Sequence, residues 1–348
     1  EEAEKNDHRR IGTDLDLFSL DPVAPGSPFF HPKGAFLYNA LIDYVRKLYV
    51  KYGYDEVITP LIFKSDLWKT SGHYETFKND MFMFKAEDAE YGVKPMNCPG
   101  HCVLYGVRRR SYRELPLRYA EFSRLHRFER SGVLSGITRV RSFAQDDAHI
   151  FCTREQIDTE FSAFLEMTQE VYRTLGLGKP EIAVATCPPN YLGTPEMKAE
   201  AETKLMEGLK KAGLPFTINA GQGAHYAPKV EFNFRDTLDR VWTLSTIQVD
   251  YVLPARFRLA YTASDSRPNT PVMLHRAILG SLERFLGIYI EHTGGNFPLW
   301  LAPTQVRVLT ITDAQAEYAA KIAAALREKG FRVGVDPSGD KVGAKIRE

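Results

Sequence analysis

Several features that would assign this protein to a specialised class are missing from its sequence. Four cysteines in 348 residues are too few and too scattered for a disulfide framework, which indicates a reducing, cytoplasmic compartment. No apolar run approaches the roughly 18 residues of a membrane span, and the first ten residues, EEAEKNDHRR, lack the apolar core of a signal peptide. We therefore expect no membrane partner.

Charge of one sign is also missing. The formal net charge is +1, so the overall charge does not indicate nucleic-acid binding. Any such contact must come from local basic patches such as Arg108–Arg110. That cluster is equally compatible with an ordinary solvated face.

Short motifs of nucleotide and metal chemistry are absent as well. The sequence has no Walker loop, no GxGxxG after an expected strand and no HExxH. Phosphate chemistry would then fall to arginines, whose planar forks match phosphate oxygens. Arg127, Arg139 and Arg284 are available for this from different elements.

What is present favours large cores and about two domains, with 44% hydrophobic residues. Extended runs from residue 118 onward, with helical segments between them, predict an α+β fold: one large, mostly antiparallel sheet with helices against it. Residues 303–348 read as strand, helix, strand, the pattern of a parallel α/β unit. We place a domain boundary near residue 302, and expect the chain to be a fragment of a longer protein because its last residues resemble the start of an element.

Helical periodicity is clearest over residues 34–52, where apolar side chains recur at helical spacing and Gly53 provides a natural end. Helices are also predicted over 156–175 and 196–212, and strands over 181–186 and 216–219. The strand-like segment YDEVITP after the first helix is compatible with plain packing or with an edge that meets a second subunit.

The most informative stretch runs from Glu121 to Thr153 and predicts two strands joined by a turn-rich loop. Arg127 and Glu129 are two residues apart, as are Gln145, Asp147 and His149. Alternate side chains of a strand share a face, so each predicted strand projects polar groups to one side. An ordinary hairpin with one solvated face is the simpler alternative. The same alternation places Lys229 with Glu231, and Thr246 with Gln248 and Asp250.

Isolated sulfur and imidazole groups give weaker signals. Met96 and Cys98 alternate as on a strand that Pro99 would end, and His101 lies between Cys98 and Cys102. A structural zinc site usually has a second ligand pair, which is missing here, so buried free cysteine is the alternative. His73 lies among glycine and serine, and we expect it on a solvated loop.

Longer motifs bring these signals together. RFERSG with RVRSFAQDD resembles motif 2 of class II aminoacyl-tRNA synthetases, the helix with YDEVITP resembles motif 1, and GSLERF resembles motif 3. MNCPGH, QDDAHIF, YAPK and PVMLHRAI resemble the threonyl-tRNA synthetases. The resemblance implies a catalytic domain over 1–302, a truncated anticodon-binding domain over 303–348, and a homodimer. It also implies ATP-dependent activation of L-threonine to threonyl-adenylate and transfer to the 3′ end of tRNA(Thr).

The resemblance further implies one zinc ion held by Cys98, His149 and His275, with a position left open for substrate. Threonine can bind zinc through its amino and hydroxyl groups, whereas valine lacks the hydroxyl and would leave polar groups unpaired. Asp147 would accept a hydrogen bond from that hydroxyl. The remaining implied threonine-binding residues are Met96, Gln145, Tyr226 and Gln248.

For the nucleotide, the resemblance implies that Arg127 holds the α-phosphate and that Glu129 meets the adenine amino group. Phe143 and Arg284 would sandwich the adenine, and Arg139 with Arg284 would neutralise pyrophosphate, with Mg²⁺ accompanying ATP. The other implied roles are adenylate binding by Gln145 and Lys229, ATP binding by Thr246, Gln248 and Ser281, and a place near the tRNA's terminal ribose hydroxyl for His73.

The sequence departs from the family pattern at Ala227 and at 243–245, and we expect these changes to retune the rim of the pocket. A catalytically inactive paralogue and a synthetase for another amino acid such as proline are the alternatives. The motif 2 and motif 3 arginines argue against the first, and the Cys/His/His set argues against the second.

Overall fold

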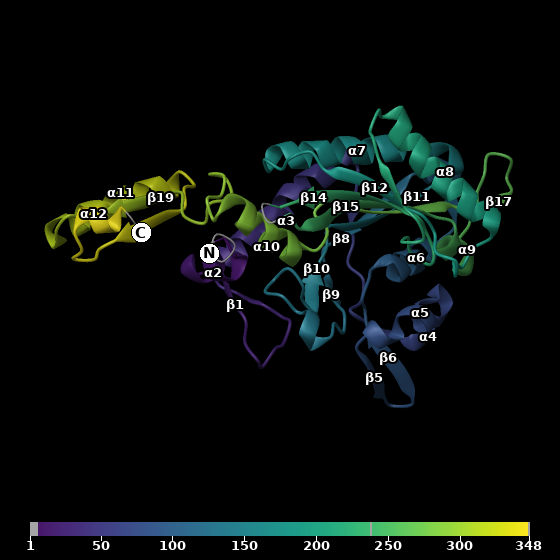
Figure 1. Cartoon of the computed structure of the whole chain (residues 1–348), viewed down its shortest axis with the longest axis horizontal. Helices are drawn as coiled ribbons and strands as arrows, with labels where there is room; N and C mark the ends of the chain where they lie inside the picture. The colour runs from purple at the N-terminus through teal and green to yellow at the C-terminus, as the bar shows by residue number, and fades with distance from the viewer. Residues whose placement is uncertain (1–5, 237–238, 347–348) are drawn as a thin grey trace.

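The computed structural model describes residues 6–236 and 239–346. A broad sheet with helices on both sides forms most of the molecule, and residues 303–346 lie apart at one end, coloured yellow in Figure 1. Within the described residues, no helix combines the length and the apolar character needed to cross a bilayer.

The central sheet has eight strands, and every pairing except the two at its edges is antiparallel. This agrees with the predicted α+β class. The strands, in spatial order, are β13 (Thr217–Asn219), β12 (Glu181–Ala185), β14 (Lys229–Arg235), β15 (Val241–Asp250), β18 (Val272–Ala277), β11 (Asp147–Cys152), β8 (Leu117–Glu121) and β3 (Asp55–Glu56).

Four long helices complete the main core: α3 (Pro32–Tyr52), α7 (Ile157–Thr174), α8 (Pro195–Lys211) and α10 (Leu282–Thr293). Their buried apolar residues join those of the sheet in one hydrophobic cluster. In α3 the predicted periodic residues Leu37, Leu41 and Val45 are fully buried, and Gly53 ends the helix at φ +71°. A positive φ is readily adopted only by glycine, which explains why the helix stops there.

The two faces of the sheet are covered by different elements. Figure 1 shows α7 and α8 along one face, and α6 with the β9–β10 hairpin on the other. The elements not yet named are α2 (His8–Asp14), β1 (Phe18–Ser19), β2 (Phe29–Phe30), β4 (Ile62–Lys64), α4 (Ser65–Ser71), α5 (His73–Phe77), β5 (Met83–Ala86), β6 (Ala89–Val93), α6 (Cys98–Gly106), β7 (Arg110–Ser111), β9 (Arg124–His126), β10 (Ser142–Ala144), α9 (Val252–Arg256), β16 (Tyr261–Thr262) and β17 (Pro268–Asn269).

The C-terminal part contains the strand–helix–strand unit that the sequence predicts. β19 (Val306–Leu309) and β20 (Val333–Asp336) are parallel, α11 (Ala316–Glu328) connects them, and α12 (Val342–Lys345) follows.

Three local predictions are wrong. β9 ends at His126, so Arg127 and Glu129 lie beyond the strand rather than on one of its faces. Cys98 begins helix α6 instead of ending a strand, because Pro99 is well suited to the first turn of a helix. His73 is buried at the start of α5 and is not on a solvated loop.

Candidate active site

Strand register aligns polar residues in two rows across the open face of the sheet. Directly paired residues on neighbouring strands project to the same side, so each row forms a continuous surface. One row is Lys229, Gln248, His275, His149 and Tyr119. The next contains Glu231 paired with Thr246 and Thr246 with the apolar Ala277, and then Asp147 paired with Glu121.

Two adjoining cavities lie over these rows, with volumes of about 320 and 160 Å³, and Arg127, Gln145 and Thr246 line both. The predicted residues divide between them. The larger cavity is also lined by Glu129, Arg139, Phe143, Lys229, Ser281 and Arg284. The smaller is also lined by Met96, Cys98, Asp147, His149, Tyr226, Gln248 and His275.

Gln248 and His73 also lie at the smaller cavity. Gln248, predicted for both substrates, lines the smaller cavity. His73 lies beside the smaller cavity, with its ring centroid 5.8 Å from that of Tyr226.

Cys98, His149 and His275 come together in the wall of the smaller cavity. They come from α6, β11 and β18, all three are buried, and their ligand atoms lie within 4.8 Å of one another. Such a set of three sulfur and nitrogen donors beside an open cavity matches a zinc site that keeps one position for substrate.

Hydrogen bonds outside this cluster fix which nitrogen each histidine offers. The Glu121 carboxylate accepts from His101 Nε2 at 3.0 Å, and with this proton on Nε2, His101 Nδ1 accepts from His149 Nδ1, 2.8 Å away. His149 Nε2 then carries its lone pair. His275 Nε2 donates to the Asp250 carboxylate at 2.8 Å, which leaves Nδ1 as the free ligand atom. Both rings therefore fit a metal ion in tautomers held by outer partners.

Burial sets the protonation of the same groups. It raises the pKa of Cys98, with Asp147 and Cys102 adding to the effect, so the thiol ionises only when a cation is nearby. Burial and the neighbouring imidazoles lower the pKa of His149, which keeps this ring in its neutral, ligating form. Burial also raises the pKa of Asp147, which accepts from Asn97 Nδ2 at 3.0 Å.

The larger cavity concentrates positive charge. Burial, followed by the charges of Arg127 and Arg139, lowers the pKa of Arg284. The guanidinium of Arg127 lies 5.2 Å from the ring centroid of Phe143, and Arg284 Nε donates to the Thr138 carbonyl at 3.0 Å. A bound polyanion would relieve this repulsion, which makes the cavity suited to phosphate groups.

Two carboxylates balance part of this charge. Glu129 pairs with Arg139 at 3.0 Å, and Glu231 pairs with Lys229 at 2.7 Å. Glu231 was not predicted to line the site, although its alternation with Lys229 pointed to the same face.

His73 has one defined tautomer. Ser71 Oγ donates to the Trp68 carbonyl at 3.1 Å, so it must accept from His73 Nδ1, 2.7 Å away. The lone pair is then on His73 Nε2, a buried atom with no hydrogen-bond partner among the described residues. Burial, with His275 next, lowers the pKa of His73 to about 3, so the ring is neutral near pH 7.

The residues that depart from the family pattern fall in two places. Thr243 and Leu244 line the larger cavity, whereas Ala227 is fully buried. Ser245 is also buried, and its hydroxyl donates to the Ile278 carbonyl at 2.6 Å while accepting from the Tyr172 hydroxyl at 2.9 Å.

Some functional partners were missed by sequence reasoning. His101 was noted only as lying between two cysteines, and Asp250 only as sharing a face with Gln248. Both are hydrogen-bond partners of the two histidines of the Cys/His/His cluster, a role that depends on packing between elements.

Comparison with known proteins identifies the family. Residues 81–293 match the model of the tRNA synthetase class II core domain (G, H, P, S and T), and residues 305–348 match that of an anticodon-binding domain. A threonine–tRNA ligase of Bdellovibrio bacteriovorus is 49% identical over the whole chain, which covers 53% of that protein. The chain thus spans about half the length of the curated relatives it matches.

Solved structures agree. A threonyl-tRNA synthetase domain from Cryptosporidium parvum has a TM-score of 0.94 and 47% identity, with 98% of this chain and 86% of that one covered. A prolyl-tRNA synthetase of Giardia lamblia shares the fold alone, with a TM-score of 0.77, 16% identity and coverage of 99% and 67%. The chain therefore belongs to the class II aminoacyl-tRNA synthetases, within the threonyl-tRNA synthetase family.

Proposed function

We propose that the chain uses ATP to activate L-threonine as threonyl-adenylate and transfers threonine to the 3′ end of tRNA(Thr). The observation that carries this proposal is the direct junction of a cavity holding a Cys/His/His donor set with a cavity lined by three arginines. An amino acid in the first and ATP in the second would meet at the shared residues Arg127 and Gln145.

The smaller cavity is the proposed threonine site. Cys98, His149 and His275 would hold zinc, which when bound supplies a Lewis acid for the amino and hydroxyl groups of threonine. Asp147, oriented by Asn97, would accept a hydrogen bond from the hydroxyl. Valine lacks the hydroxyl and would leave the Asp147 carboxylate with its bond from Asn97 but without the bond from the substrate, which provides strong discrimination.

The larger cavity is the proposed site of ATP, which we expect to bind with Mg²⁺. The threonine carboxylate attacks the α-phosphorus and pyrophosphate leaves, while Arg127 stabilises the charge on the α-phosphate. Arg139 and Arg284 would bind the leaving pyrophosphate, and Phe143 with Arg284 would enclose the adenine. The ion pair between Glu129 and Arg139 would break when Glu129 binds the adenine amino group and Arg139 binds the phosphates.

In the second step, threonine would be transferred to tRNA at the side of the smaller cavity where His73 lies. The terminal ribose hydroxyl of tRNA attacks the threonyl carbonyl and AMP leaves. The lone pair on His73 Nε2 makes this neutral ring a suitable acceptor for the hydroxyl proton, and Gln145 and Lys229 would hold the adenylate.

Further proposals concern organisation. We propose a catalytic domain over 1–302, an anticodon-binding segment over 303–348, and a cytoplasmic location supported by four unpaired cysteines. A homodimer is supported by exposed apolar side chains in and after the motif 1 segment, including Val50, Ile58 and Leu61.

The decisive experiment is ATP–pyrophosphate exchange by the zinc-replete chain with threonine, valine or proline as the amino acid. We expect exchange with threonine, at least about 100-fold less with valine, and none with proline. Absence of threonine-dependent exchange would contradict the proposal, and stronger exchange with proline would identify a different synthetase.

A further inference from the structure

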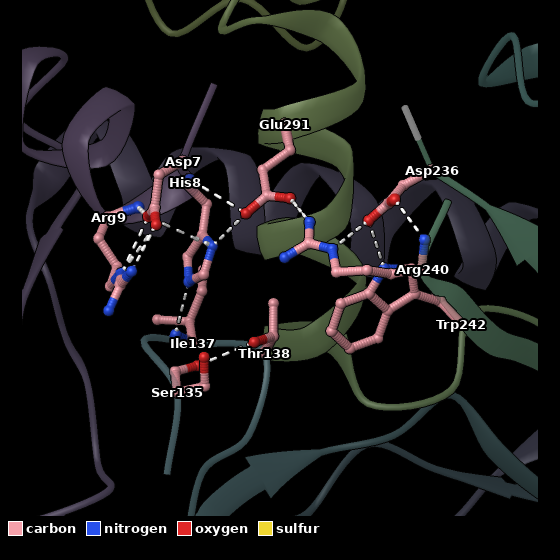
Figure 2. Close-up of polar contacts among 10 residues, drawn as sticks. All are labelled: Asp7, His8, Arg9, Ser135, Ile137, Thr138, Asp236, Arg240, Trp242 and Glu291. Atoms are coloured by element: carbon pink, nitrogen blue, oxygen red, sulfur yellow. Dashed lines mark hydrogen bonds and ion pairs between the residues drawn. The ribbon is translucent and has the colours of Figure 1, made fainter. Parts of the chain in front are cut away.

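The N-terminal helix α2 contacts the loop beside the larger cavity through one buried histidine. His8 is the first residue of α2, which packs against α10, and its side chain is 4% exposed. Figure 2 shows its ring between Glu291 of α10 and Ile137 of the loop that follows β9. Its role is not explained by the proposed chemistry, because it does not line either cavity.

Hydrogen bonds assign a single protonation form to His8. The Ile137 backbone N–H donates to His8 Nε2 at 3.2 Å, so this nitrogen carries the lone pair. The proton is therefore on Nδ1, which donates to Glu291 Oε1 at 2.6 Å. Asp7, His8 and Glu291 are close enough to form a metal cluster, but both ring nitrogens are already engaged, so we interpret the group as a hydrogen-bonded joint.

Glu291 anchors the other side of the joint. Burial raises the pKa of Glu291, but hydrogen bonds from the ring and backbone of His8 and the charge of Arg240 outweigh it, so the pKa falls below its usual value. Arg240 contacts the second carboxylate oxygen and also donates to Asp236 at 2.6 Å. Trp242 Nε1 donates to Asp236 at 2.8 Å, which extends the network toward β15 (Figure 2).

The loop is shaped to fit against the ring. Gly136 has φ +48°, and a Cβ there would lie 2.0 Å from His8 Nε2. On the facing helix, a Cβ at Gly287 would lie 2.8 Å from Thr138 Cγ2. Two glycines therefore allow the loop to approach both His8 and α10 closely.

The joint leads directly to the arginines of the larger cavity. Ile137 is followed by Thr138, whose carbonyl accepts from Arg284 Nε at 3.0 Å, and then by Arg139. Thr138, Arg139 and Arg284 all line that cavity. We propose that His8 is a positioning residue for nucleotide binding: by accepting the Ile137 N–H, it fixes the backbone that orients Arg284 and presents Arg139. The inference rests on the proposed function only in naming the nucleotide as ATP.

Two near-isosteric substitutions separate the two hydrogen bonds. Asparagine places its amide near the position of Nδ1, so His8→Asn keeps the bond to Glu291 and leaves the Ile137 N–H unpaired. Glutamine reaches the position of Nε2, so His8→Gln keeps an acceptor for Ile137 and loses the bond to Glu291. We expect His8→Asn to raise the KM for ATP about tenfold and His8→Gln to raise it less than about threefold.

Three readouts distinguish positioning from a general loss of structure. In His8→Asn the KM for threonine and the zinc content stay within about twofold of wild type, and amide hydrogen exchange over residues 135–139 accelerates; in His8→Gln that exchange stays slow. Equal ATP effects in the two variants, or equal increases in both KM values, would overturn the proposal. If the wild-type chain shows no threonine-dependent exchange, the proposed function fails, and the ATP dissociation constants of the same variants by calorimetry then decide the role of His8.

Discussion

Outer hydrogen bonds decide what each histidine of the donor set can do. Glu121, acting through His101, leaves His149 with a lone pair on Nε2, and Asp250 leaves His275 with one on Nδ1. The lone pairs therefore exist before any ion binds, and only the Cys98 thiol must lose a proton. Cys98 is therefore the residue whose protonation would depend most on a bound metal ion.

We expect Cys98→Ser to reduce bound zinc strongly and to raise the KM for threonine by roughly 100-fold or more, because both substrate contacts to the metal are lost. The ATP dissociation constant should change little, since the proposed ATP site is the other cavity. Zinc analysis by mass spectrometry and calorimetry with each substrate provide the measurements. Cys102→Ala is the matched control, because Cys102 is equally buried one helical turn later and lies outside the donor set. Full zinc content in Cys98→Ser would contradict the assignment.

At the scale of elements, helix α10 connects the larger cavity, the proposed nucleotide site, to the core. Ser281 caps its N-terminus by accepting from the Arg284 backbone N–H at 3.2 Å, and the same residue lines the larger cavity. The predicted ATP-binding residue is therefore also a structural one, and its two roles respond differently to substitution.

Ser281→Ala should lower the free energy of unfolding by about 1 kcal/mol through loss of the cap, as measured by urea denaturation. Ser281→Asp should keep the cap and the stability, but its negative charge should raise the KM for ATP by about tenfold. Ser281→Asn is the neutral control and should remain near wild type in stability. An unchanged KM for ATP in Ser281→Asp would show that phosphates do not bind in this cavity.

The elements themselves were largely accessible from the sequence. The α3 helix, the antiparallel pattern and the C-terminal strand–helix–strand unit follow from local periodicity, which needs no knowledge of partners. The start of α6 at Cys98 does have a local signal, because Pro99 suits the first turn of a helix as well as the end of a strand. The burial of His73 and the place of His8 were not accessible in this way. Each depends on packing between segments far apart in the chain, and a single sequence does not encode that packing in its local pattern.

On the scale of the whole molecule, one buried carboxylate joins four segments. Glu121 of β8 accepts from Thr59, Lys94 and His101, at distances of 2.7 to 3.0 Å for the shortest contact of each. Burial raises the pKa of Glu121, but the hydrogen bonds outweigh burial and lower it from 4.5 to about 2. The native state therefore binds this proton more weakly than the unfolded chain does.

The stabilisation from Glu121 is present above pH 4.5 and is lost as the pH falls toward 2. We expect Glu121→Gln to reduce the free energy of unfolding by up to about 3 kcal/mol near pH 7, with the difference from wild type shrinking below about pH 4. Urea unfolding at a series of pH values measures this. The control variant Glu207→Gln, at an exposed residue of α8, should have the same free energy of unfolding as wild type at every pH. A difference between Glu121→Gln and wild type that stays constant with pH would contradict the assignment.

Association of two chains is the second property at this scale. Ile58 is 90% exposed in the segment after β3, near other exposed apolar side chains. If this surface forms the proposed dimer interface, Ile58→Asp should increase the dissociation constant of the dimer at least about 100-fold in sedimentation experiments. Val23→Asp, at a residue 80% exposed on another segment, is the control. A wild-type chain that is monomeric at micromolar concentration would refute the dimer.

Because His149 pairs with His275 on a neighbouring strand, the proposed metal site depends on the alignment of these two strands. A slip of one residue between β11 and β18 would turn one imidazole to the opposite face of the sheet and abolish the cluster. These two proposed ligands come from segments 126 residues apart in the chain, and the third, Cys98, comes from a helix that must dock separately. Capture of zinc during refolding would therefore report the moment at which the centre of the sheet reaches its native register.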